Sequence, residues 1–157
     1  MSNVPFDLGR LPALRHLKVQ QLSYGDNLAL LHSVTQLLSL SSSLSSSFNG
    51  IEVLEIGFTW RRIEVEHGKD LFFSDAGWPT LDQLLTSQMF VSLRRIILRL
   101  DIEFSKRRSQ RKRNDSRQHI LELERNLAFY VNDLFPLFRA DTQRTLESQI
   151  TCRYSDY

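Results

Sequence analysis

The chain has 157 residues, 41% of them hydrophobic and 24% charged, with a formal net charge of +2 at pH 7. This length fits one globular domain that buries about two thirds of its surface, and the small net charge does not by itself indicate a nucleic-acid partner. The single cysteine, Cys152, excludes an internal disulfide and favours a reducing compartment, the cytoplasm or the nucleus. The uncharged stretch between Asp26 and Glu52 contains too many polar residues for a membrane span.

The first 49 residues predict a strand and then a helix. Residues 11–22 carry the spacing Leu-x-x-Leu-x-Val-x-x-Leu, which is typical of a leucine-rich-repeat strand. Four apolar side chains of this strand are expected to point inward: Leu14, Leu17, Val19 and Leu22. From Leu28 the apolar residues recur with helical spacing. The serine-rich stretch 39–49 that follows is either a flexible segment or a frayed continuation of this helix.

The middle of the chain predicts a second strand, a short helix and a third strand. Residues 51–58 match the spacing of the first strand, and residues 62–66 alternate in polarity, so a hairpin that folds back on the second strand is an alternative. Thr80 is expected to cap a helix whose start is fixed by Pro79. From Leu98 to Phe104, apolar residues alternate with charged ones, as in a strand with one buried face.

The last third of the chain predicts an exposed basic loop, a long helix and a closing strand. Residues 105–116 are polar or charged and are expected to form the loop. An amphipathic helix is expected to start near Ser116 and to bend or stop at Pro136, because proline has no backbone N–H to donate inside a helix. Residues 145–152 predict a weaker strand, with Cys152 as a small buried side chain and not a nucleophile.

The order strand, helix, strand, helix, strand, helix, strand predicts a single α/β domain over residues 1–157. Connections long enough for a helix join parallel strands. We therefore expect a short leucine-rich-repeat-like coil with a mostly parallel four-stranded sheet and helices on one side. An ordinary open α/β sheet is the alternative, because the strands are more widely spaced than in ordinary leucine-rich repeats. The predicted core consists of Leu17, Val19, Leu54, Ile56, Leu81, Leu85, Leu93, Leu98, Leu100, Ile102, Leu127, Val131 and Leu134.

One phrase of the sequence resembles a known family. It reads Trp78-x-x-Leu81-Asp82-x-Leu84-Leu85 and continues as Phe90-x-x-Leu93-Arg94-x-Ile96. This phrase resembles the C-terminal part of fungal, mushroom-type F-box and leucine-rich-repeat-like proteins, and residues 11–22 and 51–58 resemble the repeats that precede it. The resemblance implies a leucine-rich-repeat-like fold and a substrate-receptor role in a ubiquitin ligase. The F-box that normally precedes the repeats is absent from the sequence, so we expect at most a remnant of such a receptor.

No set of residues matches a catalytic, cofactor-binding or metal-binding motif. Three candidate metal ligands lie close together in the sequence: Glu64, Glu66 and His67. Exposed strand and loop positions explain these three better than a metal site does. Asp101 and Glu103 share one strand face, which suits acid–base catalysis only if a pocket raises the pKa of one of them. The neighbouring Arg99 indicates simple charge balance instead.

The strongest local charge feature is a basic segment. Its members are Lys106, Arg107, Arg108, Arg111, Lys112 and Arg113. Three interpretations compete: a solvated loop, a nuclear-import signal, and a contact with nucleic acid or an acidic partner. No aromatic residue lies within the segment, which argues against nucleic-acid binding.

The strand residues that alternate with the core side chains predict a binding face. In a leucine-rich-repeat-like coil, the outward residues of the parallel strands form one continuous surface on which such proteins bind other proteins. The predicted protein-binding residues are Lys18, Gln20, Glu55, Thr59, Arg99, Asp101, Glu103, Glu147, Gln149 and Arg153. Their mixed charge suits a reversible polar contact.

The sequence therefore favours a non-enzymatic protein-interaction module with a protein partner and without a cofactor, a metal ion or a membrane segment. The first alternative is a nuclear or nucleic-acid-associated protein that uses the basic segment. The second is a degenerate fragment with no defined activity.

Overall fold

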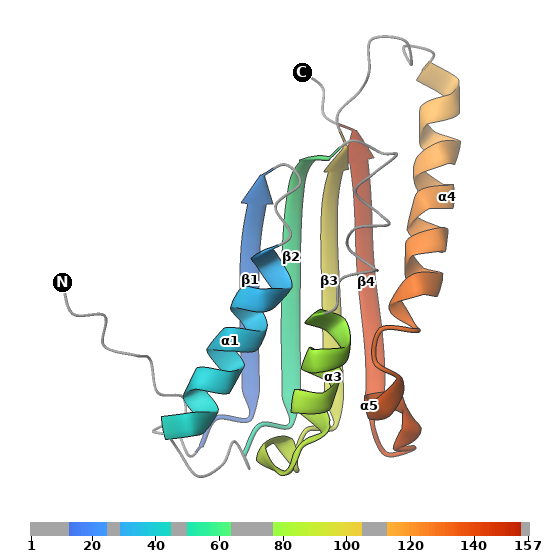
Figure 1. The fold of residues 1–157 in the computed structure, drawn as a ribbon. Coiled ribbons are helices and arrows are strands. Elements are labelled where there is room, and N and C mark those ends of the chain that lie inside the picture. The colour runs from blue at the N-terminus through green and yellow to red at the C-terminus, as the bar shows by residue number, and fades with distance from the viewer. Residues whose placement is uncertain (1–12, 25–28, 45–49, 64–76, 105–112, 155–157) are drawn as a thin grey trace, which may run out of the picture.

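The computed structural model describes residues 13–24, 29–44, 50–63, 77–104 and 113–154. At its centre lies a four-stranded sheet, made of β1 (His16–Tyr24), β2 (Val53–Ile63), β3 (Arg95–Phe104) and β4 (Thr145–Tyr154). The strands lie side by side in chain order, and each neighbouring pair is parallel (Figure 1). The predicted α/β class with a parallel four-stranded sheet is thereby confirmed.

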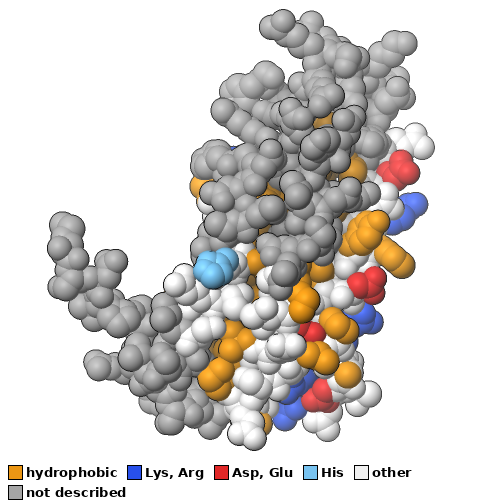
Figure 2. All heavy atoms as spheres, in the orientation of Figure 1, with side chains coloured by type: hydrophobic (Ala, Val, Ile, Leu, Met, Phe, Trp, Pro, Cys, Tyr) orange, Lys and Arg blue, Asp and Glu red, His pale blue; other side chains and the backbone are white. Residues whose placement is uncertain are grey.

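The described helices all lie on one face of this sheet (Figure 1). They are α1 (Ala29–Leu44), α3 (Gly77–Thr86), α4 (Arg113–Val131) and α5 (Pro136–Ala140), with a short 3-10 helix, η2 (Gln88–Phe90), after α3. When each strand is added beside the previous one through right-handed crossovers, the helices fall on the same side. Figure 2 shows this side of the molecule, where hydrophobic, acidic and basic side chains are interspersed along the edge occupied by α4 and α5 in Figure 1.

The hydrophobic core lies between the sheet and the helices. Eleven of the thirteen predicted core residues are buried, so most of the sequence-based core is confirmed. The other two, Leu17 and Val19, are only partly buried and pack against the core. Both belong to β1, an edge strand, which has a neighbouring strand on one side only.

The starts of the strands repeat one backbone arrangement. The carbonyl oxygen of Arg15 accepts a hydrogen bond from the N–H of Glu52 at 2.9 Å. The carbonyl of Glu52 accepts one from the N–H of Arg94 at 2.9 Å, and that of Arg94 accepts one from the N–H of Thr145 at 2.8 Å. The Arg15 and Glu52 carbonyls also accept hydrogen bonds from the N–H groups of Val53 at 3.0 Å and Arg95 at 3.1 Å, respectively. The residue before each of the first three strands therefore accepts a hydrogen bond from the first residue of the next strand.

One sequence prediction about the strands is wrong, and one alternative is not realised. Leu22 points away from the core and is 52% exposed, because β1 continues to Tyr24 and its side chains keep alternating beyond Val19. The hairpin alternative also fails over the described residues, because β2 runs on through Ile63 with a register shift between Arg61 and Ile63. Residues 64–67, which include the candidate metal ligands, lie outside the described residues.

The helices differ from their predictions mainly at their starts. α3 begins at Gly77, so Thr80 lies inside the helix and does not cap it, while Pro79 sits in the first turn, where a missing N–H is tolerated. α1 continues to Leu44, so residues 39–44 are a helical continuation. α4 begins at Arg113, three residues earlier than expected. The stop expected at Pro136 is present, since α4 ends before it and α5 begins with it.

The phrase that starts at Trp78 has a packing role in this fold. The Trp78 ring is 2% exposed and makes edge contacts with Phe58 at 6.0 Å and Phe135 at 5.6 Å between ring centroids. Asp82, one helical turn later and 1% exposed, accepts hydrogen bonds from the backbone N–H groups of Leu137 at 2.8 Å and Phe138 at 3.0 Å. These contacts attach α5 to α3.

Candidate functional site

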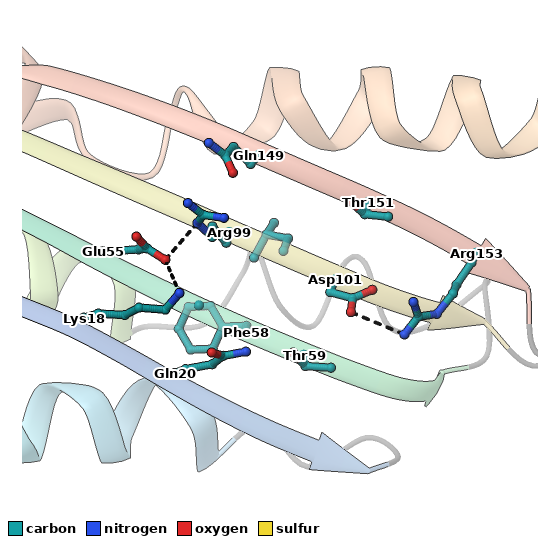
Figure 3. Close-up of a pocket in the computed structure, with 12 residues that line it drawn as sticks. Lys18, Gln20, Glu55, Phe58, Thr59, Arg99, Asp101, Gln149, Thr151 and Arg153 are labelled. Atoms are coloured by element: carbon teal, nitrogen blue, oxygen red, sulfur yellow. Dashed lines mark hydrogen bonds and ion pairs between the residues drawn. The ribbon is translucent and has the colours of Figure 1, made fainter.

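The sheet face opposite the helices, called the outer face below, is free of described helices and carries mostly polar side chains (Figure 3). All-parallel sheets are usually covered on both faces, so an uncovered polar face is unusual. All ten predicted protein-binding residues lie on it, because β-strand alternation and the parallel register place them there together. The members on the described strands are Lys18 and Gln20 on β1, Glu55 and Thr59 on β2, Arg99, Asp101 and Glu103 on β3, and Glu147, Gln149 and Arg153 on β4.

Glu55 is the buried charge of the outer face. Its Oε1 atom lies 2.7 Å from Lys18 Nζ and 2.8 Å from Arg99 Nε, and its Oε2 atom lies 3.8 Å from His16 Nε2. The Glu55 side chain is only 6% exposed because half-exposed basic side chains cover it. The hydrogen bond from Lys18 is the main reason that the pKa of Glu55 is lowered, and the positive charges around it add to this effect against the opposing effect of burial.

A second charged group lies toward the carboxyl ends of the strands. Arg153 Nη2 is 3.3 Å from Asp101 Oδ2, and Arg153 Nε is 3.5 Å from Glu103 Oε2. The sequence indicated Arg99 as the counter-ion of these carboxylates, and this is wrong. Arg99 instead reaches Glu55 on β2, whereas Arg153 lies directly opposite Glu103.

A hollow of about 270 Å³ occupies the middle of the outer face (Figure 3). Gly57 lines this hollow beside Gln20, and a Cβ atom added at Gly57 would lie 3.3 Å from Cγ of Gln20, so a larger residue there would displace the Gln20 side chain. Eight of the ten predicted residues line the hollow; Glu103 and Glu147 lie on the same face outside it. Thr151 also lines the hollow and was missed, although its position between Gln149 and Arg153 on β4 follows from simple alternation.

Glu147 belongs to a separate ion pair at the edge of the outer face. Its Oε2 atom lies 2.6 Å from Arg95 Nη2, and both side chains are almost half exposed. The hydrogen bond between them is the main reason that the pKa of Glu147 is lowered and the pKa of Arg95 is raised. Exposed pairs of this kind contribute little to stability, so Arg95, which is not among the ten predicted residues, is a suitable position for a control variant.

The other candidate sites are only partly visible. Of the basic segment, Arg113 is the first residue of α4, and residues 106–112 lie outside the described residues. Among the residues that the structure describes, no group of three histidine, cysteine or acidic side chains is arranged to hold a metal ion. Within the same part of the chain, no helix is long and apolar enough to cross a membrane.

Cys152 lies on the inner side of β4, beneath α4. Its backbone N–H donates a hydrogen bond to Glu124 Oε1 at 2.8 Å, so α4 satisfies a backbone donor of this edge strand. Burial, together with the negative charges of Glu124 and Asp101, raises the pKa of the thiol to about 12. A thiol with this pKa is almost entirely protonated at neutral pH and is a poor nucleophile.

We therefore expect Cys152 to react very slowly in the folded protein. Relative to an ordinary thiol with a pKa of about 8.5, the thiolate fraction at pH 8 falls by roughly three orders of magnitude. The rate of modification by iodoacetamide at pH 8, with and without denaturant, measures this difference. Equal rates in the folded and the unfolded protein would contradict the buried position of the thiol.

The comparisons with known proteins return no relative. No protein-family model, no curated protein and no solved structure matches this chain. The function assigned to the outer face therefore depends on its own geometry and charge.

Proposed function

We propose that this chain is a non-enzymatic protein-interaction module that binds its partner on the outer face. The observation that carries the proposal is the outer face itself: four parallel strands present one continuous polar surface that no described helix covers. Its charges are mixed and mostly paired, which suits a reversible contact with a protein and not the binding of a polyanion.

We further propose that the fold is a short leucine-rich-repeat-like coil and a remnant of an F-box substrate receptor. Three features support this: sequential parallel strands, helices on one side, and the repeated backbone arrangement at the strand starts. Each is expected when a strand–helix unit is repeated along a chain. The buried thiol of Cys152 fits a reducing compartment, which we take to be the cytoplasm or the nucleus.

A pulldown from an extract of the source organism tests the interaction. Wild type is compared with the double variant Arg99→Glu/Asp101→Lys, which reverses two charges of the hollow and keeps the net charge. We expect the amount of captured partner, quantified by mass spectrometry, to fall by about tenfold or more. In the double variant each reversed charge faces a partner group of the same sign, and such repulsion weakens binding strongly.

Two further variants make this result interpretable. Gln149→Trp fills the hollow without removing an ion pair, so it should also reduce the amount of captured partner. This variant keeps the test valid if the double variant does not fold. Glu122→Lys/Arg125→Glu makes the matched charge changes on exposed positions of α4 and should leave capture unchanged. If all of these proteins capture the same partners, the outer face is not the binding site.

A further inference from the structure

The outer face is small for a contact between two folded domains. Strands about 4.8 Å apart, with about ten residues each at about 3.3 Å per residue, give a face of roughly 14 Å by 30 Å. This is about 400 Å², or half of the area that each partner buries in a standard complex. A short extended segment of a partner matches this area better than a folded domain does.

Arg99 has oriented hydrogen-bond donors that the fold does not use. Its Nε atom lies 2.8 Å from Oε1 of the buried Glu55 carboxylate, and this ion pair holds the guanidinium group at the hollow. The two terminal nitrogens of Arg99 have no partner among the described residues, and the side chain is 47% exposed. The terminal nitrogens of a guanidinium group match the two oxygens of a carboxylate. Glu55 therefore holds Arg99 in a position that suits a carboxylate ligand.

Arg99 lies in a row of residues that crosses the whole sheet. Gln20, Gly57, Arg99 and Gln149 are direct partners in the register of the four strands (Figure 3). Neither Gln20 nor Gln149 has a hydrogen-bond partner among the described residues, and both line the hollow. The row spans about 14 Å, the length of about four extended residues. The two carboxamides can thus bond peptide groups on either side of a ligand side chain placed over Arg99.

The charge of the hollow selects the sign of that side chain. The basic residues that line it are Lys18, Arg99 and Arg153, and the acidic ones are Glu55 and Asp101. Arg153 is paired with Asp101 and with Glu103, which lies outside the hollow, whereas Lys18 and Arg99 share the single carboxylate of Glu55. The cluster around Glu55 therefore carries one positive charge in excess, which complements a single carboxylate. A lysine or arginine side chain of a ligand would be repelled at the same place.

We propose that the outer face binds an extended segment of a partner protein through one aspartate or glutamate side chain, which pairs with the terminal nitrogens of Arg99. Gln20 and Gln149 bond the peptide groups that flank this residue, and the hollow accommodates the segment. This inference rests on the proposed function and adds the chemistry of the ligand.

Selection from a displayed library of random twelve-residue peptides tests the proposal. The peptides are fused to the display protein through their C-termini, so a carboxylate can come only from a side chain. We expect peptides selected on wild type to be enriched in aspartate or glutamate. For a selected peptide made synthetically with a C-terminal amide, we expect at least a tenfold loss of affinity when its acidic residue is changed to the amide, and a similar loss for Arg99→Gln.

Matched variants separate the arginine geometry from general charge. Arg95→Gln removes the same charge from the same strand and face but lies outside the hollow, so affinity should stay within twofold of wild type. Arg99→Lys keeps the charge but loses the paired donors, so we expect a loss between those of Arg95→Gln and Arg99→Gln. Gln149→Ala should weaken binding about threefold. Thermal unfolding of each variant shows that it is folded.

Three outcomes overturn the proposal: no enriched peptides, enrichment without acidic residues, or equal losses for Arg99→Gln and Arg95→Gln. The pulldown separates this failure from that of the proposed function. If captured partners depend on the outer face while selected peptides lack acidic residues, only the carboxylate ligand is wrong. If capture is indifferent to the outer face, the interaction function itself is wrong.

Discussion

Replacing Trp78 with alanine is expected to lower the free energy of unfolding by about 4 kcal/mol. A domain of this size is typically stable by only about 5–15 kcal/mol, so this single change removes a large share. The reason is the position of the ring, which is 2% exposed between β2 and the segment that leads into α5. Its edge contacts with Phe58 and Phe135 link the sheet to the C-terminal helices.

Guanidinium chloride unfolding followed by circular dichroism measures this loss. Trp78→Phe keeps an aromatic ring in the site and should lose about half as much, because a smaller cavity remains. Leu137→Ala is the matched surface control, since Leu137 lies on α5 but is 51% exposed, and its effect should stay within about 0.5 kcal/mol. A Trp78→Ala protein that unfolds at the wild-type midpoint would show that the ring does not connect these elements.

The fold was predictable from the sequence wherever the periodicity of one element was clear. The alternation from Leu98 to Phe104 predicts both the strand and its buried face, and the structure buries all four of the apolar residues in it. The parallel arrangement follows from helix-length connections between successive strands. The end of a strand is harder to predict. The leucine-rich-repeat spacing predicts that Leu22 points inward, but β1 continues to Tyr24 with its side chains still alternating, and Leu22 therefore points outward.

The outer face was predictable as a surface but not as a set of contacts. Alternation alone places the ten predicted residues on one side of the sheet. The pairing of Arg99 with Glu55, in contrast, depends on the register between β2 and β3. The burial of Glu55 was also not predictable, because the basic side chains that cover it come from neighbouring strands.

The role of Asp82 could not be predicted either, because it also depends on contacts between distant parts of the chain. In the sequence it is a charged residue on a short helix, and its hydrogen-bond partners lie 55 and 56 residues further along the chain. Only the packing of α5 against α3 brings them together. The Trp-x-x-Leu-Asp phrase therefore has a structural explanation here: Trp78 fills the core beside α5, and Asp82 binds the start of α5.

Replacing Asp82 with alanine is expected to cost about 3 kcal/mol of stability. The carboxylate accepts hydrogen bonds from two backbone N–H groups at the start of α5, and Asp82 and Phe138 are both buried. Removing the acceptor leaves donors without a partner in a place that water reaches poorly, which costs about 1–3 kcal/mol for each such group, and it also removes a helix cap. Chemical unfolding gives the total loss.

Amide hydrogen exchange locates the effect of this substitution. The N–H groups of Leu137 and Phe138 should exchange faster in Asp82→Ala, because they lose their acceptor, while amides in the central strands β2 and β3 change less. Asp133→Ala is the control, since Asp133 is an exposed aspartate near α5 whose side chain has no hydrogen bond or ion pair among the described residues. Unchanged exchange at Leu137 and Phe138 would show that Asp82 does not hold α5.

The stabilising effect of Asp82 is also expected to depend on pH. Burial raises the pKa of Asp82 above its ordinary value, and the two backbone hydrogen bonds oppose this shift only in part. The folded protein then binds the proton more tightly than the unfolded chain does, so the contribution of Asp82 is fully present below the unfolded pKa of about 4. It decreases as the pH rises through the higher pKa of the folded state. We compare the free energy of unfolding of wild type with that of Asp82→Asn, which cannot titrate. The value for wild type minus that for the variant should therefore decrease between about pH 4 and neutral pH. A difference that grows over this range would mean that the backbone hydrogen bonds outweigh burial and that the carboxylate is bound preferentially in its charged form.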